Sequence, residues 1–468
     1  MAGANNLIRG YGLAIETNPG HFNPITHYPP LYPLIVAAVL AIGGASVTAL
    51  KILNAVIFGL NIFVVGITLI RITGGTIWPA VLGSTVTMIC FDMLFQHSWL
   101  LTDALFVLLV IISLVCLDRF VRNRLRSYFL AAVVLTGLAC LTRYAGLGIL
   151  LAQAVFLMFF DRANPFFARV VRATILCVGS LLPLALWLLR NFLLESDLTD
   201  RPLAVHIISW QHVNMALPVL AKWLLPGFLG LILLYSLRNS FRARSQLDDF
   251  SVGSLETLLL LYMVSYSTFL LFTITFVDAH TPLNGRILLS LFPCAVIVFV
   301  SLGNKICQPI STRLSCRALI GLIFLGTSVT YGKESLEFVR YAHENGLGYA
   351  SRQWISSPTM ATLHSYREPI RVYSNGTDVV RVLTRHHAFP IPRLVNPTSR
   401  RSNPNFEQQL LNMKRTLKSQ PSVLVWFREL ESRRWYLPSE SELIDTLELR
   451  VVRKLQDGTV YRLIGDTN

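Results

Sequence analysis

Two carboxylates stand at the ends of long apolar stretches, and they are the first residues of this sequence that could do chemistry. Asp103 ends the segment FQHSWLLTD, and Asp92 lies near the end of the preceding apolar run. Charge close to lipid is costly, so it favours a function such as coordinating a cation or holding a sugar hydroxyl. The structural alternative for Asp103 is a helix cap, with Thr102 or Asp103 accepting bonds from free N–H groups. For Asp92 the alternative is an ion pair with a neighbouring base.

Three arginines occupy comparable places, Arg143 in LTRYAG, Arg190 in WLLRNFLL and Arg286 in NGRILL. A guanidinium can grip a phosphate with two parallel hydrogen bonds, which would suit a phosphate-bearing ligand. The alternative is that these long side chains only reach toward lipid head groups. Both interpretations of Arg143 and Arg286 remain open at this point.

Three histidines, His27, His97 and His280, also lie close to the ends of apolar stretches. Together with Asp103 they could bind a divalent metal, and His27 and His97 are the candidate ligands. Their spacing matches no metal motif, and a lone histidine is more often a hydrogen-bonded structural residue. The sequence therefore requires no cofactor, and a divalent metal is one alternative.

Composition indicates that membrane helices position these residues. Of the 468 residues, 53% are hydrophobic and 14% charged, whereas a soluble domain carries about 25% charged residues. The net charge of +15 is dispersed between apolar runs, which favours cytoplasmic basic loops over a nucleic-acid-binding face. The seven cysteines form no CxxC pair or zinc spacing, so we expect neither disulfides nor a structural metal cluster.

Ten stretches approach the roughly 20 apolar residues that a spanning helix needs. They must be helices, because lipid offers no partner for open backbone groups. The fourth and fifth are short and could form one hairpin bent at RYAG. The stretches are 47–70, 78–95, 103–121, 128–142, 145–160, 173–194, 218–237, 254–277, 285–303 and 316–332.

Basic residues alternate between successive loops. DRFVRNRLRS, DRANPFFARVVR and RNSFRARSQ are rich in arginine, whereas QHSWLLTD, RYAG and DAHTPLNGR carry at most one each. Because cytoplasmic loops carry the excess of Lys and Arg, the arginine-rich loops are predicted to be cytoplasmic. The N-terminal segment, the other loops and the C-terminal region are then predicted to lie outside.

The C-terminal region contains no long apolar run. IRVYS and SVLVWF predict strands, TDVVRVL and NFEQQLLNMKRTLK predict helices, and LRVVRKLQDGTVYRLI predicts a hairpin that turns at Asp457 and Gly458. The predicted fold class is mainly α, a polytopic transmembrane helical bundle with a small outer-face α/β C-terminal domain. Its predicted parts are an outer loop with an interfacial helix at 1–46, a bundle at 47–332 and an extracytoplasmic domain at 333–468.

Two prolines, Pro29 and Pro30, precede an apolar run at 31–44 that is too short to span comfortably. They deny a helix before residue 31 and fix an extended approach. We expect the run to form a helix in the outer interface, with Tyr28 and Tyr32 at head-group depth. Such a helix would frame the entrance to a cavity.

Several segments together resemble the polytopic GT-C-type glycosyltransferases. ANNLIRGYGLAI and HYPPLYPLIVAAVLAIGG are similar to the family's first outer loop. LLTDALF, GLACLTRYAGLGIL, LWLLRNFLL and NGRILLSLFP are similar to later landmarks, in the same order. The relatives in question are RgtA/B/C/D-like proteins, protein mannosyltransferases and the aminoarabinose transferase of lipid A. The resemblance covers roughly residues 1–303.

This resemblance implies a sugar donor on a polyprenyl phosphate and transfer at the outer face of a bacterial plasma membrane. The acceptor would be a lipid, a glycan or a protein, and no nucleic acid is implied. Asp103 would be a catalytic acid, and His27 and Tyr28 would bind substrate. Arg143 and Arg286 would hold the lipid phosphate.

The family also places a catalytic acid just before its A-x-N-L-x-x-G-x-G stretch, and here that position lies at or before Met1. Glu16 follows the stretch and does not match the acid. We therefore expect the natural reading frame to extend upstream of Met1 and to encode a further span and this acid. The alternatives are a transporter or flippase of a lipid-linked glycan, and an inactive truncated scaffold.

Overall fold

The computed structural model describes residues 2–44, 47–195, 205–240, 252–307, 313–384, 386–397 and 400–464. The chain divides into two compact units. One comprises Tyr28–Arg340, and the other comprises Met1–His27 together with Tyr341–Asn468. We name the first the bundle unit and the second the sheet unit.

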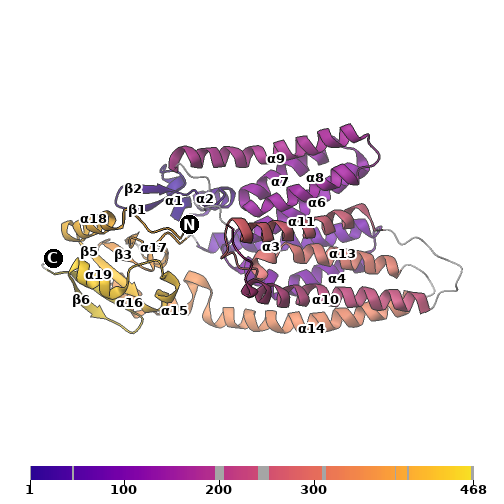
Figure 1. Cartoon of the computed structure of the whole chain (residues 1–468). Helices are drawn as coiled ribbons and strands as arrows, with labels where there is room; N and C mark the ends of the chain where they lie inside the picture. The colour runs from indigo at the N-terminus through magenta and orange to yellow at the C-terminus, as the bar shows by residue number, and fades with distance from the viewer. Residues whose placement is uncertain are drawn as a thin grey trace. The chain divides into compact units, whose positions relative to one another are not determined.

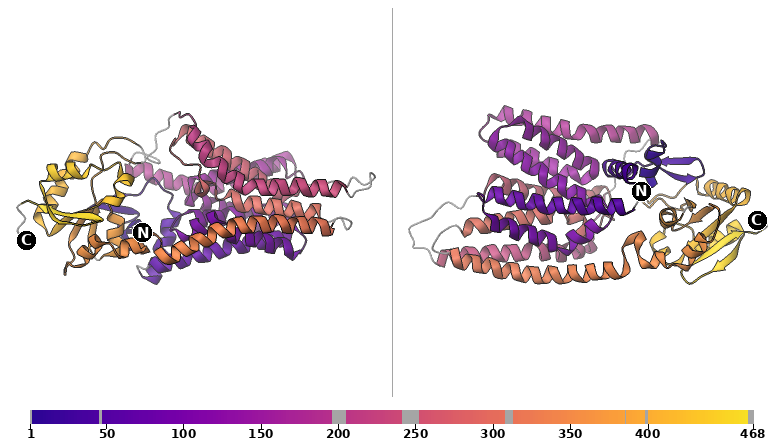
Figure 2. Two further views of the ribbon diagram at one scale, coloured as in Figure 1. Left: turned by 90° about the horizontal axis from the view of Figure 1, so that it is seen from below. Right: turned by 180° about the vertical axis from the view of Figure 1, so that it is seen from behind.

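The bundle unit is made of helices that lie side by side (Figures 1 and 2). Helices occupy all ten predicted stretches, which confirms the helical bundle. In chain order they are α2 (Leu31–Gly43), α3 (Val47–Ile72), α4 (Ile77–Ile89), α5 (Phe91–Ser98), α6 (Asp103–Asn123), α7 (Arg126–Thr142), α8 (Leu147–Phe159), α9 (Phe166–Glu195), α10 (Trp210–Ser240), α11 (Ser254–Phe276), α12 (Gly285–Leu288), α13 (Leu291–Ile306) and α14 (Arg313–Asn345).

Among the described residues, five helices are long and apolar enough to cross a membrane: α3, α6, α9, α10 and α11. The helices α4 and α5 make a sixth such segment only as a pair, because they are bent by 57° where they meet. The break falls at Cys90, whose backbone is extended (φ −68°, ψ 121°). The stretch predicted at 78–95 is therefore a broken helix, and the bend aims α5 away from the axis of α4.

One further prediction is confirmed, and two other predicted stretches have a different form in the structure. The predicted hairpin at RYAG is present, since α7 ends before Arg143 and α8 begins at Leu147. The stretch at 285–303 divides into α12 and α13. Helix α14 continues to Asn345 through polar helix formers, so the predicted boundary after residue 332 falls inside it. Parts of the predicted loops, at 196–204, 241–251 and 308–312, lie outside the described residues.

The sheet unit contains a five-stranded sheet in the order β4-β3-β5-β7-β6. Strands β4, β3 and β5 are parallel, and β7 runs antiparallel to both β5 and β6. The predicted strands and hairpin are confirmed, whereas β4 was not predicted because its sequence, HAFP, contains no β-branched residue. The strands are β3 (Arg371–Ser374), β4 (His387–Pro390), β5 (Ser422–Phe427), β6 (Leu449–Lys454) and β7 (Gly458–Leu463).

Both faces of this sheet are covered, because alternate residues of a strand point to opposite sides. Tyr373 and Trp426 pack with residues of α18 (Phe406–Ser419) and α19 (Glu440–Leu447). Val372 and Val425 pack with residues of α16 (Pro358–His364) and α17 (Thr377–Leu383). At the β6–β7 turn a side chain at Gly458 would lie 2.6 Å from the Trp426 carbonyl oxygen, so the predicted turn needs glycine.

The N-terminal segment belongs to the sheet unit. It forms α1 (Ala2–Ile8) and an antiparallel pair, β1 (Ala14–Asn18) with β2 (His21–Pro24). The Asn6 amide donates to the Ala14 carbonyl oxygen at 3.0 Å, and the Tyr373 hydroxyl donates to Asn18 Oδ1 at 3.1 Å. The expected outer loop at 1–46 is thus divided, with its second half forming α2 in the bundle unit. As predicted, α2 begins directly after Pro30.

Candidate functional site

A buried carboxylate between two arginines is the centre of the candidate site. Asp103 opens α6 and its side chain is 1% exposed. Its Oδ1 forms an ion pair with Arg143 Nη1, and its Oδ2 lies 3.1 Å from Arg286 Nε. The structure therefore brings together three of the predicted site residues from segments far apart in the chain.

The local backbone explains why these side chains meet. Arg143 follows the end of α7 with extended backbone (φ −152°, ψ 140°), which turns its side chain out of the helix. Asn284 caps α12 by accepting a hydrogen bond from the Ile287 N–H, and this sets the start of the turn that carries Arg286. Thr102 makes no side-chain cap. The Asp103 carboxylate is bonded to arginines, in a position where the N-terminus of α6 also favours negative charge.

The two arginines differ in exposure. Arg143 is 15% exposed, and its guanidinium lies 5.7 Å from the centre of the Phe106 ring. Arg286 is 42% exposed, and the phenol of Tyr28 lies within electrostatic range of it. Because Asp103 engages Arg286 through Nε, the two terminal nitrogens of Arg286 can face a ligand. Arg143 is suited to holding Asp103, and Arg286 to meeting substrate.

A second charged cluster lies around Asp92 in α5. Trp223 Nε1 donates to Asp92 Oδ2 at 3.2 Å, and Lys222 Nζ lies 4.0 Å from the same oxygen. Lys222 also forms an ion pair with Glu334 of α14. The expected ion pair of Asp92 is present, and sequence reasoning missed its partners. The signal that could have found them is Lys222 itself, a lone cation inside the apolar sequence of α10.

The two clusters meet at one turn. A side chain at Gly285 would place its Cβ 2.5 Å from Asp92 Oδ1, so this close approach needs glycine. The next residue, Arg286, is bonded to Asp103. The turn at 284–286 therefore lies between the two carboxylates and joins them into one charged site.

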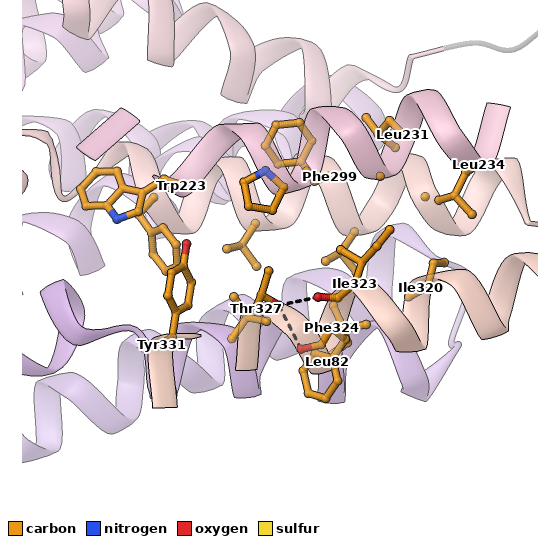
Figure 3. Close-up of a pocket in the computed structure, with 18 of the residues that line it drawn as sticks. Leu82, Trp223, Leu231, Leu234, Phe299, Ile320, Ile323, Phe324, Thr327 and Tyr331 are labelled. Carbon is orange, nitrogen blue, oxygen red and sulfur yellow. Dashed lines mark hydrogen bonds between the residues drawn. The ribbon is translucent and has the colours of Figure 1, made fainter. Parts of the chain in front are cut away.

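An apolar pocket lies between α4, α10, α13 and α14 (Figure 3). The empty space along it amounts to about 740 Å³, which includes space open to the surroundings. Trp223 and Tyr331 stand at one end of the row of lining residues, and Leu234 and Ile320 stand at the other. The hydroxyl of Thr327 is bonded to carbonyl oxygens of its own helix, so it leaves the wall apolar. Since Trp223 also bonds Asp92, the pocket ends at the charged site.

His97 holds the start of α6 in place. Its Nδ1 donates to the Met93 carbonyl oxygen at 2.6 Å, and its Nε2 accepts from the Asn61 amide at 3.0 Å. The same amide donates to the Ala104 carbonyl oxygen at 3.1 Å, next to Asp103. Both ring nitrogens of His97 are therefore engaged by the protein.

The remaining candidates are placed as follows. His27 is half-buried in the sheet unit, and His280 is exposed with its backbone N–H bonded to Asp278. Arg190 lies over the Trp187 ring at 4.6 Å. Within the described part of the chain, no group of three His, Cys, Asp or Glu side chains is arranged to hold a metal ion.

The fold and the site define a class, the polytopic helical membrane proteins that carry a small α/β unit. No family model matches the chain, and no curated protein matches its sequence. Solved structures share its fold. Similar are ArnT from Cupriavidus metallidurans bound to undecaprenyl phosphate (TM-score 0.59, 14% identity, 99% of this chain and 92% of that chain) and the same protein in the apo state (TM-score 0.58, 15% identity, 98% and 91%). The chain is an integral membrane protein with this fold, as the resemblance predicted.

Proposed function

We propose that this chain is a membrane glycosyltransferase that moves a sugar from a polyprenyl-phosphate donor to an acceptor at the outer face of the membrane. The observation that carries the proposal is the apolar pocket that ends at a charged site. A polyprenyl phosphate has the same two parts, a long apolar chain and an anionic head. The fold shared with a protein crystallised with undecaprenyl phosphate supports the proposal.

The donor's prenyl chain lies in the pocket of the bundle unit, where burial of apolar surface supplies binding energy. Its phosphate lies beyond Trp223, within reach of Lys222 and Arg286. As the bond between sugar and phosphate breaks, negative charge grows on the phosphate. A pre-positioned arginine stabilises that charge more than it stabilises the bound donor, which is the condition for catalysis.

Asp103 and Arg143 set the position of Arg286. Arginines meet both carboxylate oxygens of Asp103, so this carboxylate is poorly placed to receive the proton of an acceptor hydroxyl. Asp103 therefore acts in the site by fixing the arginine that meets the phosphate. Tyr28, which lies within electrostatic range of Arg286, binds the donor with it.

Asp92 is the carboxylate that takes the proton of the acceptor hydroxyl. Its described partners, one indole N–H and one ammonium group at 4.0 Å, both lie at Oδ2, whereas arginines meet both oxygens of Asp103. It lies against Gly285, one residue from Arg286. A base adjacent to the phosphate site is what attack on the donor sugar requires.

The charged site and the sheet unit lie outside the cytoplasm in this proposal. Helix α6 supports this orientation, because it starts at Asp103 and carries Arg119 and Arg122 in its last turns. The loop at its end is also arginine-rich, as cytoplasmic loops are. A C-terminal reporter that is active only outside the cytoplasm tests it, and a cytoplasmic reporter would contradict it.

The function is tested with purified protein in nanodiscs, a radiolabelled polyprenyl-phosphate sugar and a fraction of envelope lipids and glycans as acceptor. We expect label to leave the prenyl phosphate and appear in the acceptor fraction. In the matched variants, Thr327→Trp fills the pocket and weakens donor use, whereas Leu322→Trp, at a side chain 67% exposed on the same helix, does not. If no label is transferred in nanodiscs, and the same protein in lipid vesicles carries the intact donor across the membrane, the transporter is supported instead.

A further inference from the structure

Two loops of the sheet unit form a structured surface away from its sheet. Their described residues are 393–397 and 400–405 in the first loop and 428–438 in the second. The Leu394 and Val395 N–H groups of the first loop donate to the Tyr436 carbonyl oxygen of the second at 2.9 and 3.4 Å, and the Asn403 N–H donates to the Leu394 carbonyl oxygen within the first loop at 2.9 Å. An isolated bridge also joins Val395 to Ser402. The two loops are therefore held together by backbone hydrogen bonds.

Three arginines of these loops lie on two aromatic rings. The Arg400 guanidinium is 4.0 Å from the centre of the Trp435 ring. Arg393 and Arg434 lie 5.4 and 5.9 Å from the centre of the Tyr436 ring, and Arg434 also donates to the Tyr436 hydroxyl at 2.5 Å. We name these five residues the arginine–aromatic surface. Stacking on a ring fixes the plane of a guanidinium and so the direction of its N–H groups.

The surface has unbalanced positive charge. Arg393 and Arg400 are exposed, and within the described residues neither has a carboxylate at ion-pair distance. Arg434 has a distant one, Asp378, at 3.9 Å. Trp435 is 49% exposed although it is a large aromatic side chain. The surface therefore presents positive charge beside an exposed aromatic ring.

The backbone at Arg400 is also unusual, with φ at +58°. Of the three described non-glycine residues with positive φ, Arg124 and Glu448 follow helix ends, and Arg400 alone lies in a loop. The Arg400 N–H donates to the Asn396 carbonyl oxygen at 2.9 Å, which helps to hold the backbone in this conformation. Disfavoured backbone of this kind concentrates at ligand-binding positions.

We propose that the arginine–aromatic surface binds an anionic saccharide, a sugar chain that carries carboxylate or phosphate groups. The Trp435 ring packs against the apolar face of a sugar, and Arg393 and Arg400 donate paired hydrogen bonds to its anionic group. A lipid surface is the other anionic candidate. Attraction to lipid depends on dispersed basic residues and inserted apolar side chains, whereas this surface offers arginines held on two neighbouring aromatic rings. The inference concerns the sheet unit alone and stands apart from the transferase activity.

The test is calorimetric titration of the full chain in nanodiscs of zwitterionic lipid. The probes are oligogalacturonate, a phosphorylated maltooligosaccharide and fully methyl-esterified oligogalacturonate, which keeps the sugar rings without the charge. We expect at least one anionic probe to bind and the esterified probe to bind at least tenfold more weakly. Equal binding of the charged and esterified probes, or no binding of either anionic probe, would overturn the proposal.

The variants are Arg400→Gln and Arg453→Gln, which remove the same charge. Arg453 is exposed in β6, at the opposite edge of the sheet from β4. Loss of a charge-assisted hydrogen bond predicts about tenfold weaker binding for Arg400→Gln. Arg453→Gln and the binding of prenyl donor by the bundle unit should be unchanged. Equal loss in both variants, or binding only to vesicles that contain anionic phospholipid, would contradict the assigned surface.

Discussion

Arg143 and Arg286 both pair with Asp103. Replacing each of them in turn by glutamine shows which one supports the structure and which one binds the donor. Asp103 is buried and depends on both arginines for its charge. Arg143 is 15% exposed, and losing it leaves much of a buried carboxylate uncompensated. The cost of breaking such a pair is about 3 kcal/mol. We therefore expect Arg143→Gln to lower the unfolding temperature markedly.

Arg286 should behave in the opposite way. It is 42% exposed, so solvent screens its ion pair with Asp103 and the loss of stability should be about 1 kcal/mol or less. Its contact with the donor phosphate is a charge-assisted hydrogen bond, worth about 1.5–3 kcal/mol. Arg286→Gln should therefore weaken donor binding by roughly 10- to 100-fold. Arg286→Lys keeps the charge without the planar fork and should lie between the wild type and Gln.

Two measurements on the same nanodisc samples are needed, the unfolding temperature and the dissociation constant for labelled polyprenyl-phosphate sugar. The expected pattern is a stable Arg286→Gln that binds donor poorly, beside a less stable Arg143→Gln. Wild-type donor affinity in Arg286→Gln would refute the phosphate role. An unfolding temperature as low as that of Arg143→Gln would show that Arg286 serves mainly to compensate Asp103.

Further predictions concern the neighbours of this pair. Gly285→Ala should reduce turnover by displacing Asp92. The control Gly59→Ala should not, because a side chain there would meet nothing within 4 Å. Equal turnover in both variants would contradict the close approach of Gly285 to Asp92. Asn61→Ala removes a partner of His97 and should cost about 1–3 kcal/mol in the free energy of unfolding, and unchanged thermal unfolding would argue against this anchor. Asp92→Asn should keep donor binding and lower turnover by about 10²-fold or more; a fully active variant would remove it as the base.

The helices of the bundle could be predicted because a long apolar stretch in lipid satisfies its backbone hydrogen bonds only as a helix. Their ends and breaks could not. Cys90 is neither proline nor glycine, and no local signal marks the extended backbone there that separates α4 from α5. The run at 285–303 is likewise mostly apolar, and the position of the break between α12 and α13 could not be predicted from it. In both cases packing against other helices decides where the chain bends.

The candidate site was predicted in part, through the charge of single residues. Asp103, Arg143 and Arg286 stand out because charge at a span end is costly, but only the fold shows that they bond to one another. Lys222 and Glu334 belong to helices distant in the chain from Asp92, so no spacing could connect them. The β1–β2 pair was missed because AIETN does not alternate between apolar and polar residues, and HFNP contains no β-branched residue.

Photo-crosslinking of a polyprenyl-phosphate sugar with a diazirine in its prenyl chain tests the central claim most directly. The account predicts crosslinks to pocket residues such as Phe299 and Phe324, competed away by unlabelled polyprenyl phosphate and lost in Thr327→Trp. Leu322→Trp should crosslink as the wild type does. Crosslinks confined to exposed helix faces such as that of Leu322, or crosslinks that unlabelled donor does not displace, would contradict a donor site at this pocket.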